Sequence, residues 1–340
     1  MMPSIPFKRR PIVAATTELV RMAPLAADHA IPLCITPAVP GVDLIEWAVG
    51  ARTQIDELLL KHKALLFRGF QSGSAGHFEE FARVTADGDP LEYVDRTTPR
   101  TKLTGRLYTS TIYPRDRKIN LHNEGTYWTR WPLKIFFGCL KAPETGGETP
   151  LANVAGVLRR ISAGAQQKFR ETGFLLERNY NQGFGLTWQE VFQTEDRAEV
   201  ERYCRANRID VEWTADDQLR TRQVRGAIRT HPKTGEEVWF NHAIFFHWSS
   251  YPPAILAELE RELGYDQLPY RTFYGDGSEI PAEIAAEVRA AYDAEEVAFP
   301  WLVGDILMLD NMTVAHGRAP YTGERLVAVS MYEAWGGQQV

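Results

Sequence analysis

Residues 307–321 read LMLDNMTVAHGRAPY and contain two short apolar runs on either side of Asp310-Asn311. Short apolar runs bounded by turn residues predict buried strands. We expect the first strand to lead into Asp310-Asn311 and the second strand to end at His316, with Gly317 in a turn. A histidine at a strand end is usually structural and bonds a backbone carbonyl group, so this segment alone does not establish a site.

Similar short strands, rich in Thr, Tyr, Trp and Phe and broken by Pro and Gly, recur from about residue 103 onward. Examples lie at 134–140, 238–241 and 326–334, and polar helical patterns interrupt them at 187–206 and 252–263. Many short strands with helical inserts predict a β-sandwich or β-barrel with helices packed outside.

The N-terminal part has a different pattern. Apolar residues at helical spacing over 42–63 predict one or two amphipathic helices, the apolar run 64–70 predicts a buried strand, and 75–86 predicts a further helix. We therefore expect a helical region at about 1–100 and a helical insert at about 155–265. No repeat, low-complexity tract or Gly/Ser linker marks a domain boundary.

The composition argues against several classes of function. The 340 residues carry 38 Lys+Arg against 44 Asp+Glu, and the formal net charge of −6 argues against nucleic-acid and anionic-membrane partners. No apolar run reaches the roughly 18 residues of a transmembrane helix, and no Gly-rich phosphate loop indicates a nucleotide enzyme. The three cysteines are widely separated, match no metal or redox spacing, and predict a reducing, cytoplasmic location.

His122 and Glu124 form the first candidate site, because residues i and i+2 of a strand point to the same face. Alone, a His-x-Glu pair is more often a surface ion pair than a pair of metal ligands. Together with His316 it makes two imidazoles and one carboxylate, the facial triad of non-haem Fe(II) oxygenases. Zn(II) accepts the same three ligands with an open position, so the triad alone leaves both metals open.

Arg325 and Thr149 favour iron over zinc. An isolated strand arginine is most often a solvent-exposed charge, but the Arg325 guanidinium group is a planar fork suited to a carboxylate. Beside the triad, Arg325 becomes a candidate for binding the distal carboxylate of 2-oxoglutarate, and the Thr149 hydroxyl group, just after the Gly146-Gly147 turn, could share that carboxylate.

The chain resembles the taurine dioxygenase/TfdA-like Fe(II)/2-oxoglutarate oxygenases over residues 64–335, and within them the SyrP-like amino-acid hydroxylases. The segments that carry this resemblance are 66–70 (LFRGF), 110–114 (STIYP), 121–124 (LHNE), 146–150 (GGETP), 186–188 (LTW), 238–241 (VWFN) and 310–318 (DNMTVAHGR). The resemblance implies one domain over residues 1–340, with a double-stranded β-helix (jelly roll) core and flanking helices.

The resemblance also implies the ligand set. His122, Glu124 and His316 match the family's Fe(II) ligands, and Thr149 and Arg325 match its 2-oxoglutarate contacts, with O₂ as the second co-substrate. Glu124 replaces the usual Asp, as in the SyrP-like branch and in clavaminate synthase-like enzymes. Val329 occupies the position of the arginine that holds the sulfonate in taurine enzymes, which argues against a sulfonate substrate. Related halogenases lack the carboxylate ligand, so Glu124 argues against halogenation.

The implied activity is hydroxylation of an unactivated C–H bond in an amino acid or amino-acid-derived intermediate of specialised metabolism such as antibiotic biosynthesis, with release of succinate and CO₂. Desaturation, epoxidation or cyclisation could follow from the same cofactors. A Zn-dependent hydrolase on a cupin-like barrel would leave Arg325 and Thr149 unexplained, and a non-catalytic jelly-roll binding module would have no reason to retain all five groups. Enzymes of this kind are commonly dimers or tetramers, so a homo-oligomer is compatible with the sequence.

Substrate contacts are harder to assign from sequence. Arg318 could meet a substrate carboxylate or pair with Asp310 or Glu324 as part of the structure. The other candidates are Asn120, Asn241 and His242 as polar groups of the pocket, and Trp128, Trp239 and Phe246 as apolar walls. The cluster Arg115, Arg117 and Lys118 is either a solvated face or a docking patch for an acidic carrier protein that presents an aminoacyl thioester.

Overall fold

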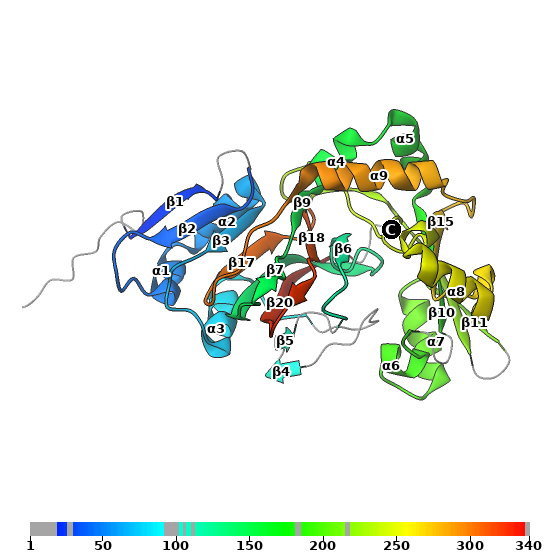
Figure 1. Cartoon of the computed structure of the whole chain (residues 1–340), viewed down its shortest axis with the longest axis horizontal. Helices are drawn as coiled ribbons and strands as arrows, with labels where there is room; N and C mark the ends of the chain where they lie inside the picture. Colours follow the sequence, from blue (N-terminus) through cyan, green and yellow to red (C-terminus); the bar gives the residue numbers. More distant parts are fainter. Residues whose placement is uncertain are drawn as a thin grey trace, which may run out of the picture.

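The computed structural model describes residues 19–25, 30–91, 102–104, 107–109, 113–180, 185–214 and 218–336. Its centre is an eight-stranded sheet in which the β2–β3 pair is parallel and the other pairs are antiparallel (Figure 1). In spatial order its strands are β1 (Val20–Pro24), β2 (Leu33–Pro37), β3 (Ala64–Phe67), β17 (Ile306–Asp310), β7 (Arg130–Lys141), β20 (Leu326–Gly336), β5 (Leu107–Thr109) and β4 (Lys102–Thr104).

The large sheet is buried on both faces. Along β7, Phe136 points to one side and its neighbours Ile135 and Phe137 point to the other, as the two-residue period of a strand requires. The Phe136 side packs against α1 (Leu44–Gly50), α2 (Arg52–His62) and α3 (Ala75–Thr85). The opposite side packs against a second, smaller sheet, so the central strands are apolar at almost every position.

The smaller sheet is antiparallel, with the spatial order β16 (Glu296–Val297), β9 (Leu151–Asn153), β18 (Val314–Arg318) and β6 (Ile119–His122). The 307–318 segment supplies β17 to the large sheet and β18 to the smaller one. The two expected strands are therefore confirmed, but β18 runs through Arg318 and Gly317 is not in a turn. A Cβ atom at Gly317 would lie 2.6 Å from the Ile119 carbonyl oxygen, so glycine allows β6 to approach closely.

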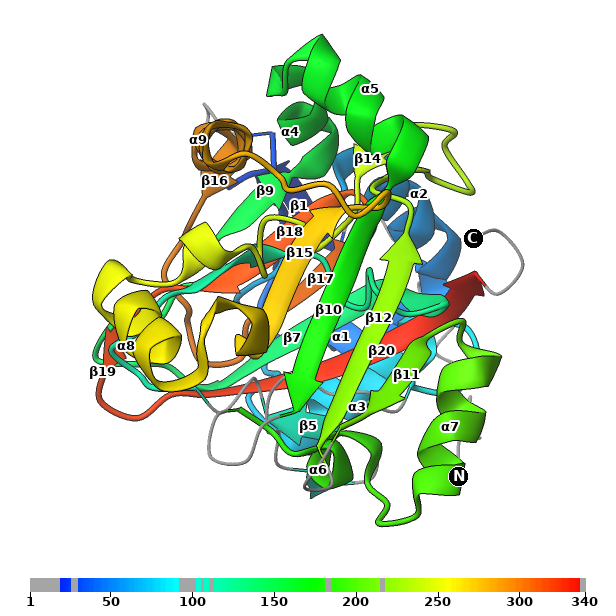
Figure 2. The same ribbon diagram turned by 90° about the vertical axis from the view of Figure 1, so that its right-hand side faces the viewer.

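A third layer covers the smaller sheet and is built from the middle of the chain (Figure 2). Its antiparallel sheet has the order β11 (Asp210–Trp213), β12 (Leu219–Arg225), β10 (Phe174–Tyr180) and β15 (Tyr270–Tyr274). The remaining elements are α4 (Val154–Arg160), α5 (Ala163–Thr172), α6 (Trp188–Phe192), α7 (Arg197–Ala206), α8 (Pro253–Leu263), α9 (Ala282–Glu295), the ladders β13 (Ile228–Thr230) with β14 (Glu237–Trp239) and β8 (Thr145–Gly146) with β19 (Tyr321–Thr322), and the short 3₁₀ helices η3 (Trp248–Ser250) and η4 (Tyr265–Gln267).

Two regional expectations need an addition. Besides the expected helices and the expected strand β3, the N-terminal region contains β1 and β2. Besides the expected helices and the expected strand β14, the insert at about 155–265 contains β10 to β13. Strand β10 was missed because it carries Glu177, a charge typical of an exposed surface. In the structure Glu177 is buried and paired with Arg222 and Arg271 at 2.7 and 3.0 Å. No helix among the described residues is long and apolar enough to span a membrane.

Candidate metal centre

Three side chains converge where β6 and β18 pair. The ligand atoms of His122, Glu124 and His316 all lie within 4.8 Å of one another. His122 ends β6 and stands opposite His316 in the ladder, with ring centroids 4.6 Å apart. Glu124 lies beyond the strand end, in the turn that follows it. The antiparallel register therefore joins residues that are far apart in the chain into one set of two imidazoles and one carboxylate.

The orientation of these side chains is supported by the backbone. His122 Nδ1 donates to the Asn120 carbonyl oxygen at 2.9 Å, which directs Nε2 toward the other two ligands. Glu124 and His316 are 8% and 5% exposed, so the site is closed on most sides. Two neutral imidazoles and one carboxylate on a single face are the donor set that suits Fe(II), so these residues fit a ferrous ion.

Asn311 holds the turn that carries Glu124, a role that the sequence analysis missed. Its side chain accepts from the Glu124 backbone N–H at 2.8 Å and donates to the Glu124 carbonyl oxygen at 2.9 Å. It also donates to the Pro132 carbonyl oxygen at 2.9 Å, and its own carbonyl oxygen accepts from the Asn123 side chain at 2.7 Å. The Asn after an apolar strand was the available signal, but its partners could not be read from the sequence.

Asp310 shapes the same turn from the other side. One oxygen of its carboxylate accepts from the backbone N–H groups of Met312 and Thr313 at 3.0 and 3.2 Å. The other oxygen lies 2.9 Å from Nε2 of the buried His231. Asp310 and Asn311 thus fix the turn by which the chain passes from β17 in the large sheet to β18, the strand that carries His316.

Thr149 and Arg325 lie together, close to β18. Arg325 Nη2 lies 3.3 Å from the Thr149 hydroxyl oxygen, and its Nε donates to the Gly147 carbonyl oxygen at 2.8 Å. The Trp301 indole N–H donates to the same hydroxyl group at 3.1 Å. The Gly317 N–H, one residue after His316, bonds the Pro150 carbonyl oxygen and keeps Thr149 beside the metal strand.

The charge of Arg325 suits a dicarboxylate. Burial, together with the nearby Arg318, lowers the pKa of Arg325 to about 10, so the guanidinium group stays protonated at neutral pH. Gly147 has a φ of +70°, and a Cβ atom there would lie 3.1 Å from Cδ of Arg325. The glycine turn therefore also gives the arginine room to reach Thr149.

Comparison with known proteins identifies the family. The model of the family described as "Taurine catabolism dioxygenase TauD, TfdA family" matches residues 27–332. The chain belongs to the TauD/TfdA family. It is thus an Fe(II)- and 2-oxoglutarate-dependent dioxygenase, which uses O₂ as its second co-substrate, rather than a zinc hydrolase or a binding module.

Two relatives of this TauD/TfdA enzyme are similar over most of its length. The dapdiamide synthesis protein DdaC of Enterobacter agglomerans is 42% identical over 279 residues, which cover 82% of this chain and 84% of DdaC. A clavaminate synthase-like protein of Arabidopsis thaliana is 33% identical over 311 residues, 86% of this chain and 89% of the relative.

Solved structures show the jelly-roll fold. PvcB of Pseudomonas aeruginosa, an Fe, alpha-ketoglutarate dependent oxygenase from an isonitrile synthetic pathway, aligns with a TM-score of 0.57 and 16% identity over 94% of each chain. A taurine dioxygenase of Burkholderia xenovorans aligns with a TM-score of 0.52 and 15% identity, covering 92% of this chain and 89% of that one.

The TauD/TfdA enzyme has a cavity of about 380 Å³ next to the candidate ligands His122 and Glu124. Aromatic rings form much of its wall, namely Tyr113, Tyr127, Phe245, Phe246, Tyr251 and Tyr270. Phe246 and Tyr270 stack with centroids 4.5 Å apart and an interplanar angle of 12°. Of the three expected apolar wall residues, Phe246 lines this cavity, whereas Trp128 and Trp239 do not.

The four residues predicted as polar substrate contacts divide into two that line this cavity and two that do not. Asn120 and His242 line the cavity. His242 Nδ1 is hydrogen-bonded to the Thr126 hydroxyl group, and burial, with a smaller contribution from His122, holds the pKa of His242 well below its usual value. His242 therefore presents a neutral imidazole at neutral pH.

Asn241 and Arg318 are held by backbone groups and do not line the 380 Å³ cavity. The Asn241 amide donates to the Ala227 carbonyl oxygen and accepts from the Ala243 N–H, both at 2.9 Å. The Arg318 guanidinium group pairs with neither Asp310 nor Glu324. It donates to the carbonyl oxygens of Tyr113, Pro114 and Arg117 at 2.6 to 3.0 Å and fixes that segment over β18. The segment 110–112, part of a motif used for the family resemblance, lies outside the described residues.

Proposed function

We propose that the protein hydroxylates an unactivated C–H bond of an amino acid or amino-acid-derived intermediate in specialised metabolism, releasing succinate and CO₂. The observation that carries this proposal is the convergence of His122, Glu124 and His316 within 4.8 Å beside an aromatic cavity. The similarity to DdaC, named for dapdiamide synthesis, supports a biosynthetic role.

Each group of the site has a role in this proposal. His122, Glu124 and His316 hold the iron and leave the opposite face open. Bound Fe(II) supplies the activation of O₂, with 2-oxoglutarate as the co-substrate that is oxidised. Arg325 and Thr149 bind the distal carboxylate of 2-oxoglutarate by charge-assisted hydrogen bonds. The aromatic wall excludes water and determines which C–H bond faces the metal.

Anaerobic spectroscopy tests the ligand assignment. Addition of Fe(II) and 2-oxoglutarate to the metal-free protein is expected to give a weak visible charge-transfer band. The His122→Ala variant should show no band, whereas His62→Ala on α2 should keep it. A band of full intensity in His122→Ala would overturn the assignment.

Mass spectrometry of the product tests the reaction. Hydroxylation adds one oxygen atom to the substrate, whereas desaturation and cyclisation remove two hydrogen atoms. Epoxidation also adds one oxygen atom, so fragmentation must locate that atom on one carbon or across two. A product that has lost hydrogen, formed together with stoichiometric succinate, would contradict hydroxylation but leave the cofactor assignment intact.

The substrate has two candidate forms, a free amino-acid derivative and one attached to a carrier protein. Arg115 and Arg117 are exposed on the segment that Arg318 fixes, and the neighbouring Tyr113 and Lys118 line the 380 Å³ cavity. This position favours neither form by itself, because Asp116 lies between the two arginines. Equal turnover of the free and carrier-bound forms would argue against a docking patch.

A further inference from the structure

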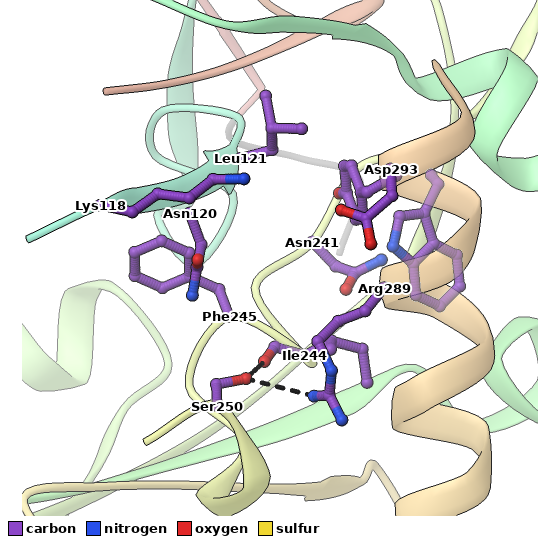
Figure 3. A pocket seen from close by; sticks show the side chains of 11 residues that line it. Lys118, Asn120, Leu121, Asn241, Ile244, Phe245, Ser250, Arg289 and Asp293 are labelled. Atoms are coloured by element: carbon purple, nitrogen blue, oxygen red, sulfur yellow. Dashed lines mark hydrogen bonds between the residues drawn. The ribbon is translucent and has the colours of Figure 1, made fainter. Parts of the chain in front are cut away.

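A second cavity, of about 100 Å³, lies between residues of β6, residues 241–250 and helix α9 (Figure 3). The two cavities are neighbours, because four residues line both of them: Lys118, Asn120, Phe245 and Ser250. Asn120 and His122 are two residues apart on β6, so they lie on the same side of that strand, and Lys118 directly precedes it. The second cavity therefore lies beside the first one, and none of the three candidate ligands lines it.

Helix α9 contributes two opposite charges to this second cavity. Arg289 and Asp293 are one helical turn apart and face the space from α9, with Lys118 and Asn120 opposite (Figure 3). Side chains four residues apart on a helix are neighbours and can pair when their charges are opposite. Neither Arg289 nor Asp293 forms an ion pair with any described residue. Burial lowers the pKa of Arg289, and the nearby Asp293 charge offsets only part of that effect.

Two serine hydroxyl groups hold Arg289 in place. Its Nη1 donates to the Ser249 and Ser250 hydroxyl oxygens at 3.1 and 3.5 Å. The hydroxyl groups are themselves fixed: Ser250 donates to the Ile244 carbonyl oxygen at 2.6 Å, and Ser249 bonds Nδ1 of the buried His247 at 2.7 Å. The guanidinium group thus keeps donors available for a ligand in a fixed position.

The other polar groups of the second cavity are mostly satisfied. Lys118 pairs with Glu296 at 3.0 Å, and the Asn241 amide bonds two backbone groups. What remains for a ligand is one guanidinium group, one carboxylate group and the Asn120 amide. A guanidinium group matches a carboxylate, and an aspartate matches an ammonium group, so the complementary ligand is an α-amino-acid zwitterion.

We infer that the second cavity binds the free α-amino-acid end of the substrate, with its carboxylate on Arg289 and its ammonium group on Asp293. A volume of about 100 Å³ holds this end alone, so the remainder of the substrate passes Asn120 and Phe245 toward the iron. The inference rests on the proposed function and chooses between the two substrate forms. A thioester formed through this carboxylate would lack the negative charge that Arg289 binds.

Ligand-observed NMR on the metal-free protein tests this inference with L-alanine, propionate and ethylamine. L-Alanine carries both charges and should bind in the millimolar range, whereas propionate and ethylamine, each with one charge, should bind at least about tenfold more weakly. Propionate binding as tight as L-alanine would overturn the zwitterion site, and so would the absence of L-alanine binding. These three ligands are compared on the wild-type protein, so the result does not depend on the folding of a variant.

Substitutions on α9 test whether L-alanine binds in the second cavity. Arg289→Gln and Asp293→Asn should each weaken L-alanine binding at least about tenfold, because each removes one partner of the zwitterion. Glu283→Gln on the same helix is the control and should leave binding unchanged. Unchanged L-alanine binding in Arg289→Gln would overturn the inference.

The charge-transfer band separates this inference from the proposed function. The wild type and both variants should show the band with Fe(II) and 2-oxoglutarate, because neither residue lies at the metal centre. A band without L-alanine binding would overturn the inference alone. L-Alanine binding without a band would overturn the ligand assignment of the proposed function and leave the second cavity as an amino-acid site.

Discussion

The metal centre and the wall that faces it across the cavity are built in different ways. The candidate ligands lie on or next to β6 and β18, whose register is set by backbone hydrogen bonds, and Asn311 ties the Glu124 backbone at both its N–H and its carbonyl group. The facing wall comes from the segment after β14 and from β15, and it is held by ring contacts such as Phe246 on Tyr270. Strand pairing fixes atoms more tightly than side-chain stacking does.

This difference separates the residues that bind the metal from the residues that select the substrate. The ligand positions depend on the backbone of the jelly roll, which cannot change without loss of the sheet. The wall depends on side chains of connecting segments and of β15, which can be exchanged while the fold is kept. We therefore expect changes at the strands to remove metal binding, and changes at the wall to alter what is oxidised and how efficiently.

The largest effect is expected for His316→Ala. The substitution removes one of three ligands from a site held by strand pairing, so Fe(II) binding and succinate formation should both fall to background. Anaerobic calorimetry with Fe(II) and a succinate assay measure the two losses. His62→Ala on α2 is the control and should leave both unchanged, and retained turnover in His316→Ala would contradict the triad.

Two buried asparagines, one at the metal centre and one in the insert, test this difference. Asn311 and Asn241 are 0% and 3% exposed, and both bond backbone groups, but Asn311 bonds the Glu124 backbone whereas Asn241 belongs to the insert. Asn311→Ala should lower Fe(II) affinity about 10- to 100-fold. Both substitutions should also lower the free energy of unfolding, each by about 2–4 kcal/mol, because buried backbone groups lose their partners.

Urea unfolding and anaerobic Fe(II) titration of the two variants give the measurement. A matched loss of stability with Fe(II) affinity lowered only in Asn311→Ala is the expected outcome. Equal Fe(II) affinity in the two variants would show that Asn311 stabilises the sheet without positioning Glu124.

Local patterns made much of this site predictable. His122 and Glu124 are two residues apart at a strand end, and His316 lies in a motif of nine residues, so each could be recognised within a short window. The contacts of Asn311 could not, because they join residues 187 and 188 positions apart. The structural partners of Arg318 could not be predicted for the same reason, since they are backbone carbonyl groups that carry no sequence signal.

The fold was predictable where hydrophobicity decides burial. The apolar runs of β7, β17 and β20 pack in the centre, and their prediction as buried strands is confirmed. The outer sheet escaped prediction because ion pairs bury the charges of β10, such as Glu177. The single domain over residues 1–340, the homo-oligomer and the carrier protein stay predictions.

A smaller effect is expected at the 2-oxoglutarate contacts. Thr149→Val keeps the shape of the side chain but removes the hydroxyl group that bonds Arg325 and Trp301. The KM for 2-oxoglutarate should rise about tenfold, the value of one charge-assisted hydrogen bond, while Fe(II) affinity stays unchanged. Thr145→Val on the same turn is the control, because its hydroxyl group bonds Thr322 instead. A KM that rises equally in both variants would contradict a specific contact.

The smallest effect on the metal chemistry is expected at the aromatic wall. Phe246→Leu removes the ring that stacks on Tyr270 but leaves every candidate ligand in place. Consumption of 2-oxoglutarate should stay within about threefold of wild type, while the ratio of oxygenated product to succinate falls, because the substrate is held less firmly before the iron. Phe240→Leu controls for lost packing, since Phe240 is buried against Trp131 and does not line the cavity. An equal fall of the product ratio in both variants would mean that this wall affects catalysis through stability and not through the position of the substrate.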